Sequence, residues 1–295
     1  AMTTTSGMVA VGYHAGKALT TGLYNVFVGM TSGDAATEAD HCTYVGYATG
    51  SAVTSGDNNT LIGSHAGDAL TTGGNHTAVG VGALGAVTTV GSLTGIGYEA
   101  GLSNTSGTDN VYLGFYAGRL VTTGSNNVMV GSHAGDATTS GAENTFIGQG
   151  AGGANTTASY NTAVGHTALD ANTTGADNVA VGRNSLGANT TASNNTALGT
   201  NALNANTTGG TNTAVGTNSG YAVTTGANNT FVGATSGDAV TTGSQNTFMG
   251  SSAGGLHTTA SNNTFVGFVA GGAVTTGASN TFIGALAGDA VTTGH

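Results

Sequence analysis

The stretch that decides the fold reads NTAVGHTALDANTTGAD and covers residues 161–177. The pattern begins again at Asn178, and its fifth position is a glycine in every copy, from Gly12 to Gly284 in steps of 17 residues. We number the positions of the repeat 1 to 17 from this Asn, and the coils from the one that begins at Met8. A fixed period without insertions is typical of a solenoid, in which each repeat stacks on the next. The sequence predicts 17 coils of 17 residues, forming a single repeat domain over 1–295 with no second domain.

Residue types within the repeat favour strands over helices. Position 2 is Thr or Val in every copy, and position 4 is Val, Ile, Leu or Met. β-Branched residues two apart and closed by a glycine are typical of a short strand that ends in a turn. Each of the two or three glycines per repeat would cost a helix about 1 kcal/mol. The sequence therefore predicts an all-β, parallel β-solenoid (a β-roll) with two short strands per coil and turns near positions 5 and 15.

Two positions predict ladders of identical side chains along the stack. Position 13 is Thr in every copy, and position 1 is Asn in thirteen copies. Stacked Asn side chains can donate from the amide of one coil to the carbonyl oxygen of another. The main interpretation is that both ladders hold the coils together; the alternative is an array that faces a ligand or ice. Representative ladder residues are Asn161, Asn195, Asn229, Asn280, Thr173, Thr207 and Thr241.

Positions 3 and 9 vary together in size. Ten copies carry a large side chain at position 3, and each of these has Gly at position 9. Four of the six copies with Ala at position 3 carry Leu at position 9. Close packing allows one large group, and not two, in a single volume. We expect these residues to form the core or an interface, and they include Phe27, Tyr44, Tyr112, Phe146, Phe231, Phe248, Phe265, Phe282, Leu169, Leu186 and Leu203.

The neighbouring apolar positions 3 and 4 predict an assembly of several chains. Adjacent strand residues point to opposite faces, so two apolar neighbours indicate a strand buried on both faces. The inner wall of the coil would consist of small residues at positions 8 and 11. A lone chain would then expose a stripe formed by Phe231, Phe248, Phe265 and Phe282, and such a patch usually marks an interface. The sequence predicts chains packed side by side, with position 3 at their common axis.

Charge and composition exclude several kinds of partner. Only three basic residues stand against 13 acids, so we expect no nucleic-acid partner and no attraction to anionic lipid. The longest apolar runs are far too short to cross a membrane. Cys42 is alone, so the chain can form no internal disulfide.

The residues of common enzyme sites do not form a recognisable motif. No phosphate loop, dinucleotide fingerprint, H-E-x-x-H or C-x-x-C occurs. His14, His65 and His133 share position 7, where we expect solvated turn residues, although a threefold axis could bring three copies of one His to an ion. Recurrent Asp residues at position 10 are expected to act as solubilising edge charges. We expect no enzyme activity, no catalytic residue, no cofactor and no metal site.

The segment from Asn161 to Leu169 resembles the head repeats of YadA-like trimeric autotransporter adhesins, and is more similar still to repeats of tail-fibre-like proteins of bacteria and phages. The resemblance covers essentially the whole chain. It implies a left-handed β-roll in each chain, a homotrimer that is intertwined or side by side, and a place outside the cell, on a bacterial or virion surface. It also implies a cell-surface glycan or protein receptor as partner. The adhesin repeat is shorter, so the turn after position 12 should be longer here.

Three classes of function remain at the level of sequence. The first is a structural fibre or adhesin shaft that holds or forms a receptor-binding surface. The alternative is an ice-binding solenoid that uses Thr ladders, although Thr at positions 13 and 14 should point to opposite faces. An enzyme built on a solenoid is the least favoured, because it would need clustered acids or bases in a groove.

Overall fold

The computed structural model describes residues 7–294, and all regular structure in this range is β-strand. Each coil contributes one strand of three residues, at positions 2 to 4, while the rest of the coil consists of turns and bends. The expectation of two strands per coil is therefore wrong. The strands are β1 (Val9–Val11), β2 (Val26–Val28), β3 (Thr43–Val45), β4 (Thr60–Ile62), β5 (Thr77–Val79), β6 (Thr94–Ile96), β7 (Val111–Leu113), β8 (Val128–Val130), β9 (Thr145–Ile147), β10 (Thr162–Val164), β11 (Val179–Val181), β12 (Thr196–Leu198), β13 (Thr213–Val215), β14 (Thr230–Val232), β15 (Thr247–Met249), β16 (Thr264–Val266) and β17 (Thr281–Ile283).

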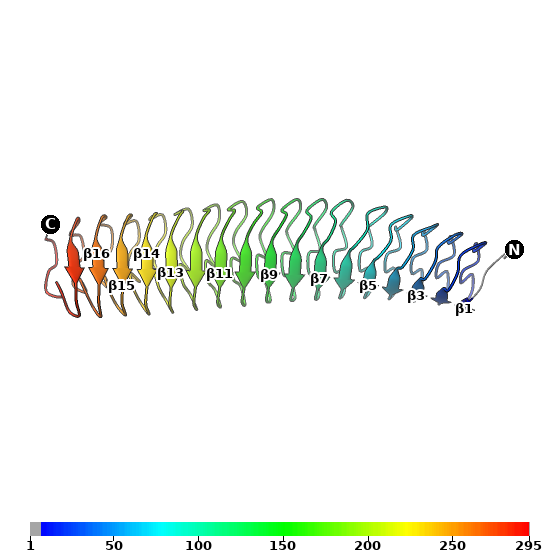
Figure 1. Cartoon of the computed structure of the whole chain (residues 1–295), viewed down its shortest axis with the longest axis horizontal. Coiled ribbons are helices and arrows are strands. Elements are labelled where there is room, and N and C mark those ends of the chain that lie inside the picture. The colour runs from blue at the N-terminus through cyan, green and yellow to red at the C-terminus, as the bar shows by residue number, and fades with distance from the viewer. Residues whose placement is uncertain (1–6, 295) are drawn as a thin grey trace. The chain divides into compact units, whose positions relative to one another are not determined.

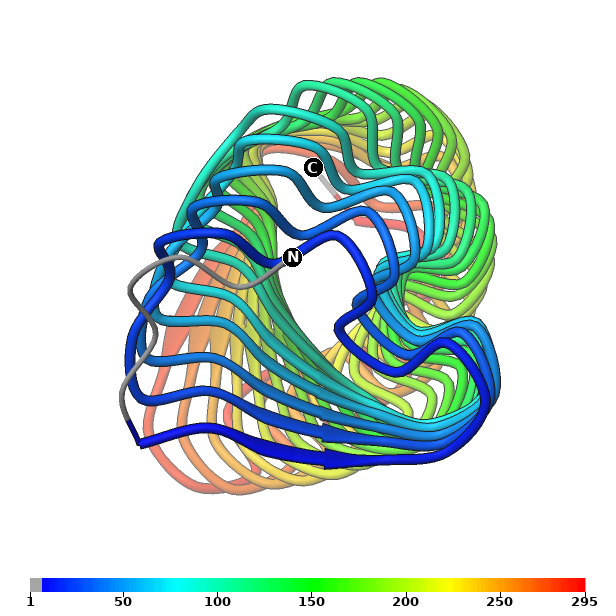
Figure 2. The ribbon, with the colours of Figure 1, turned by 90° about the vertical axis from the view of Figure 1, so that its right-hand side faces the viewer.

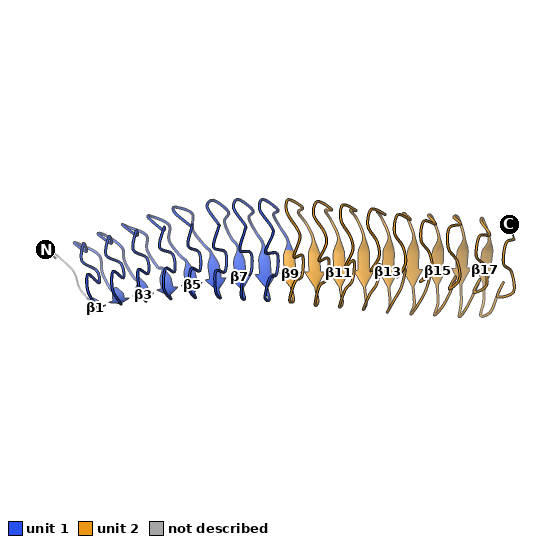
Figure 3. Cartoon of the chain, turned by 180° about the vertical axis from the view of Figure 1, so that it is seen from behind, with its two compact units in different colours: residues 1–144 blue, residues 145–295 orange. Residues whose placement is uncertain are grey.

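The chain divides into two compact units, residues 1–144 and 145–295 (Figure 3). Unit 1 contains β1 to β8, and unit 2 contains β9 to β17. Within each unit, every strand pairs in parallel with the next strand along the chain (Figure 1). Partners occupy the same position of successive coils, as Phe231 and Phe248 do. The predicted parallel solenoid is confirmed.

Position 5 must be glycine because neighbouring coils touch there through their backbones. Its φ lies between +126° and +143° in all copies, a conformation that residues with a Cβ rarely adopt. A Cβ built on Gly233 would lie 2.5 Å from the carbonyl oxygen of Gly250 in the next coil. Both constraints act together at the end of each strand, so the fixed glycine of the repeat follows from the stacking itself.

Three further positions turn the chain back to the start of the next strand. Thr235, Gly237 and Gln245, at positions 7, 9 and 17, have φ values of 52°, 60° and 59°. For a residue with a side chain this left-handed conformation costs roughly 1–2 kcal/mol in conformational free energy, and Asn tolerates it best. The same positions are left-handed in the other coils, so successive coils of a unit follow one path (Figure 2).

The core lies inside the coil of a single chain. In the coil that begins at Asn161, the buried residues are those at positions 1, 3, 8, 9, 12 and 15. Position 11, which was expected to form part of the inner wall, is half-exposed, and positions 9 and 12 take its place. Position 4 points outward. Each coil thus closes around its own layer of core residues.

Candidate functional site

The large side chains at position 3 point into the coil and are buried by the chain itself. Phe27, Tyr44, Phe146, Phe231, Phe248 and Phe265 have no exposed surface, nor do Tyr112, Leu169, Leu186 and Leu203. Only Phe282, in the last coil, is half-buried. A single chain therefore exposes no stripe of Phe231, Phe248 and Phe265. The assignment of position 3 to an axis between chains is wrong, because one coil is wide enough to enclose these rings.

Positions 3 and 9 share one volume, as their sizes predicted. A Cβ on Gly237 would lie 2.5 Å from ring atoms of Phe231 in the same coil. Where position 3 is Ala197, the side chain of Leu203 at position 9 is fully buried instead. The coil with both Ala214 and Gly220 is filled by its neighbours, since a Cβ on Gly220 would lie 2.7 Å from Phe231 Cδ2 and 2.9 Å from Leu203 Cδ2.

The Asn residues at position 1 form the predicted ladder, and it is buried. The Nδ2 of Asn229 donates to Oδ1 of Asn212 in the preceding coil at 3.1 Å and to the carbonyl oxygen of Gly243 at 2.9 Å. The backbone N–H of Asn229 donates to the same Oδ1 at 3.0 Å. The Nδ2 of Asn178 binds Oδ1 of Asn161 at 3.1 Å in the same way, and that of Asn280 binds Oδ1 of Asn263 at 3.2 Å. Asn195 joins through its backbone N–H, which donates to Asn178 Oδ1 at 3.0 Å.

A second buried Asn ladder runs along position 12 in unit 2. The Nδ2 atoms of Asn172, Asn189 and Asn206 each donate to Oδ1 of the Asn in the preceding coil, at 3.1, 2.9 and 3.0 Å. Each also donates to the backbone carbonyl three residues ahead. The ladder ends at Asn206, whose Oδ1 accepts no hydrogen bond. Its sequence signal is the recurrence of Asn at position 12 in four successive coils, from Asn155 to Asn206.

Two histidines replace ladder asparagines inside the coil. The Nε2 of His76, at position 1, lies 2.7 Å from the carbonyl oxygen of Val90, and the Nε2 of His257, at position 12, lies 2.9 Å from that of Ala260. These are the carbonyl positions that Asn Nδ2 atoms bind in other coils. Burial lowers the pKa of both imidazoles, because desolvation disfavours the charged ring. His76 and His257 therefore act as neutral structural residues.

The Thr ladder at position 13 stabilises the stack through the backbone. The hydroxyls of Thr173, Thr207 and Thr241 donate to the carbonyl oxygen of the Thr in the next coil, at 3.0, 3.0 and 3.2 Å. These hydroxyl groups therefore already donate a hydrogen bond within the stack, so they have no proton left to donate to a ligand. At position 14 the side chains, among them Thr208 and Thr242, are exposed.

The outward side of the strands forms the most regular surface of each unit, which we name the sheet face. It consists of Thr or Val at position 2 and Val, Ile, Leu or Met at position 4, so it carries no charge. Its larger aliphatic side chains are strongly exposed: Leu198 by 47% and Met249 by 42%. Sequence reasoning placed the exposed stripe one residue too early, at position 3. The apolar character of position 4 was the signal for the correct surface.

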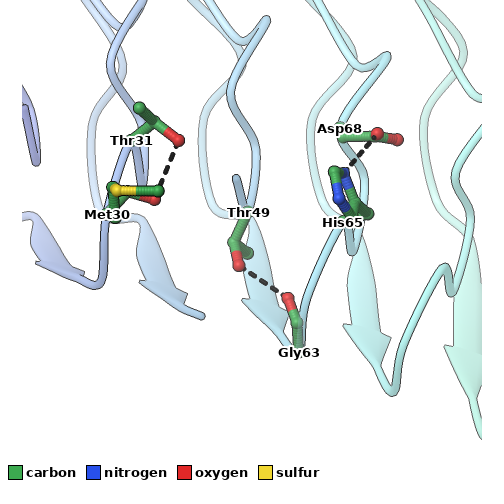
Figure 4. Close-up of polar contacts among 6 residues, drawn as sticks. All are labelled: Met30, Thr31, Thr49, Gly63, His65 and Asp68. Carbon is green, nitrogen blue, oxygen red and sulfur yellow. Dashed lines mark hydrogen bonds and ion pairs between the residues drawn. The ribbon is translucent and has the colours of Figure 1, made fainter. Parts of the chain in front are cut away.

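Ionisable side chains lie mainly at the corners of the coil. His65 Nδ1 lies 3.1 Å from Asp68 Oδ2 (Figure 4), so this position-7 histidine is paired with the acid at position 10. Nearby hydroxyls bind backbone carbonyls, as Thr49 Oγ1 does with Gly63 at 2.6 Å. Partial burial raises the pKa of Asp170 and Asp238 at position 10, so these acids are less solvated than edge charges would be. Among residues 7–294, no three His, Cys, Asp or Glu side chains are grouped to hold a metal ion.

The part of the chain that the structure describes has no helix of the length and apolarity needed to cross a membrane. Comparison of the chain with protein-family models, with curated proteins and with solved structures finds no match.

Proposed function

We propose that the chain is a shaft segment of a surface fibre or adhesin and that it assembles as a homotrimer through the sheet face. The observation that carries the proposal is the outward-facing aliphatic row at position 4, which is half-exposed at most Val residues and exposed at most Ile, Leu and Met residues, and which repeats at the strand spacing along each unit. Repeated apolar patches of this kind on a water-soluble surface are typical of interfaces. Copies of one chain offer identical, uncharged rows, so they can pack together without burying an unpaired charge. The chain would hold a receptor-binding surface away from a cell or virion, outside the cell.

Light scattering of the full chain tests the assembly. We expect three times the mass of one chain. The double variant Leu198→Lys and Met249→Lys places two charges on the sheet face, and it should give single chains with a retained β-sheet circular dichroism spectrum. A matched control, Thr208→Lys and Thr242→Lys at exposed position 14, should keep the trimer. A monomeric wild-type chain would exclude the trimer, and an unchanged trimeric mass in the sheet-face variant would exclude the sheet face as its interface.

A second candidate, ice binding, is supported by the same surface. Thr at position 2 and an aliphatic residue at position 4 point outward together, with roughly 6.7 Å between them along the strand and about 4.8 Å between coils. Such a flat, uncharged array suits a lattice better than positions 13 and 14, because the hydroxyls at position 13 are bonded to the next coil. Thermal hysteresis at millimolar chain concentration tests it. Hysteresis that Thr213→Lys abolishes, in a monomeric chain, would support ice binding and exclude the shaft; no hysteresis excludes this candidate.

A further inference from the structure

One corner of unit 1 has a hollow where coil 5 departs from the other coils of the unit. Coil 5 carries Gly82 at position 7 and Gly85 at position 10, where every other coil of unit 1 has a side chain. The missing side chains leave an open hollow of about 400 Å³. This volume lies in the range of small-ligand sites. The lining residues are His65, Asp68, Gly82, Gly85, Ala86, Leu102 and Ser103.

An exposed aromatic platform lies in the next two coils. The rings of Tyr98 and Phe115, at position 6, stack with centroids 5.5 Å apart and an interplanar angle of 16°. Tyr116 adjoins both rings, at 5.5 Å from Tyr98 and 4.0 Å from Phe115. Tyr98 is 41% exposed and Phe115 44% exposed. Large aromatic rings held in the open at successive coils offer apolar surface to a partner.

Glu99 joins the hollow to the platform. Its Cγ lies 3.4 Å from the place where a Cβ of Gly82 would stand. Its carboxylate accepts a hydrogen bond of 2.7 Å from Nε of Arg119, whose guanidinium lies 4.5 Å from the centre of the Tyr116 ring. Glu99 also raises the pKa of the Tyr98 phenol by accepting its hydrogen bond. One ion pair thus fixes the side chains along the edge of the rings.

The charges select the chemistry of the ligand. Arg119 is paired with Glu99, so it offers an anion no free positive charge, and the Asp68 carboxylate lies 3.1 Å from the His65 imidazole. A phosphate would need further basic groups, and Arg119 would repel a cation that approached the Tyr116 ring. An uncharged ligand with apolar faces and a hydroxyl rim meets both features. Its C–H faces can stack on the rings, while its hydroxyls bind the carboxylates, the guanidinium and the imidazole.

We propose that the hollow and the platform form one binding site for a neutral pyranose oligosaccharide, with one sugar ring in the hollow and the next on the rings of Tyr98 and Phe115. The proposal deepens the attachment role proposed above and rests on it for its biological meaning, but the site lies in one chain. Unit 2 provides an internal comparison. It has a hollow of about 430 Å³ lined by Thr167, Asp170, Ala171, Asn184, Gly187, Ala188 and Asn204, and positions 6 and 7 of its coils 10 to 13 carry no Phe or Tyr.

The full chain, labelled with a fluorophore, is applied to a printed array of neutral and anionic oligosaccharides, and the strongest neutral ligand is then titrated by calorimetry. We expect binding to neutral pyranose glycans. Two variants should each weaken it by at least about tenfold, a loss of about 1.4 kcal/mol. Gly82→Thr places a side chain in the hollow, and the left-handed backbone there is already adopted by Thr31, with φ 56°. Tyr98→Thr with Phe115→Thr gives position 6 the residue that it has at Thr200.

The matched control is Thr200→Ala, at position 6 of unit 2, which should bind the sugar as the unchanged chain does. Melting temperatures within a few degrees of the parent show that each variant is folded. Binding of anionic glycans alone, binding of none, or equal affinity in the folded variants overturns the proposal. Light scattering on the same samples separates the two proposals: a monomer that binds the sugar contradicts the trimeric shaft and leaves the site standing, whereas a trimer that binds none contradicts the site.

Discussion

The ring of Phe231 lies against the α-carbon of Gly237, close enough that a Cβ on the glycine would be 2.5 Å from the ring. Leu203 adopts a similar left-handed φ, 49° against 60° for Gly237, where position 3 is Ala197. The backbone therefore accepts either arrangement, and the choice depends mainly on volume.

Exchange of the two sizes should be cooperative. Phe231→Ala is expected to cost about 3–5 kcal/mol through the cavity it leaves. Gly237→Leu should cost about 1–3 kcal/mol by overpacking, with roughly 1–2 kcal/mol more for the left-handed backbone. The double variant should recover about 0.5–3 kcal/mol relative to the sum of the two. Recovery stays incomplete because Phe231 also fills the space beside Gly220. Chemical denaturation measures this cycle, and strictly additive costs would contradict the shared volume.

Two neighbouring residues separate folding from assembly. Phe248 is fully buried in the coil, whereas Met249 is 42% exposed on the sheet face. Phe248→Asp should abolish the cooperative fold, because it buries a charge without a partner. Met249→Asp should leave the melting temperature of the single chain within a few degrees and weaken the trimer. Circular dichroism and light scattering on both variants check the pair. A folded Phe248→Asp chain of reduced mass would return the interface to position 3.

The middle of the position-12 ladder should matter more than its end. Asn189→Ala removes the bonds to Asn172 and Ala192 and also the acceptor of Asn206. Asn206→Ala removes the bonds to Asn189 and Gly209, along with an Oδ1 that has no partner. Since each buried group left unpaired costs about 1–3 kcal/mol, we expect Asn189→Ala to destabilise the chain by about 1 kcal/mol more. Equal losses of unfolding free energy would contradict this difference between the middle and the end of the ladder.

Acid should destabilise the coil that contains His257. Desolvation lowers the folded pKa of this imidazole below the ordinary histidine value of about 6.5. Below about pH 6.5 the unfolded chain binds a proton that the folded chain does not, so stability falls as the pH is lowered towards the folded pKa. His257→Asn keeps a donor for the Ala260 carbonyl but does not titrate, and it should lose less stability between pH 7.5 and 5.5. His65→Asn, at an exposed corner, is the control. An equal or larger loss in His257→Asn would contradict the prediction.

The sequence predicts the fold well because its glycines, ladders and size exchange all reflect contacts between identical positions. Gly233 and the Asn229 ladder could be predicted from the period alone. Which side of the strand points into the coil could not be predicted, since Phe231 and Val232 are both apolar and adjacent. What decides it is the width of the coil, which depends on left-handed corners at residues such as Thr235 and Gln245. The residue types at these corners do not predict the left-handed conformation.

The hollow at Gly82 and the rings of Tyr98 and Phe115 were open to sequence reasoning and were missed. Each of these residues departs from the consensus of the repeat, whereas a repeat is recognised from the residues that its copies share. The second Asn ladder was missed for a related reason, because position 12 is Asn in successive coils only in part of unit 2. In a repetitive chain, the exceptions to the pattern identify the places where one coil differs chemically from the others.

The close backbone contact between Gly233 and Gly250 also limits which changes the gene can tolerate. An insertion of a few codons would separate the glycines and place a side chain where two backbones meet. Unequal recombination between similar repeats, by contrast, adds or removes 17 residues at a time and returns glycine to glycine. Length can therefore vary by whole coils at little cost to folding. The size of the side chains at positions 3 and 9 then decides which coils can become neighbours.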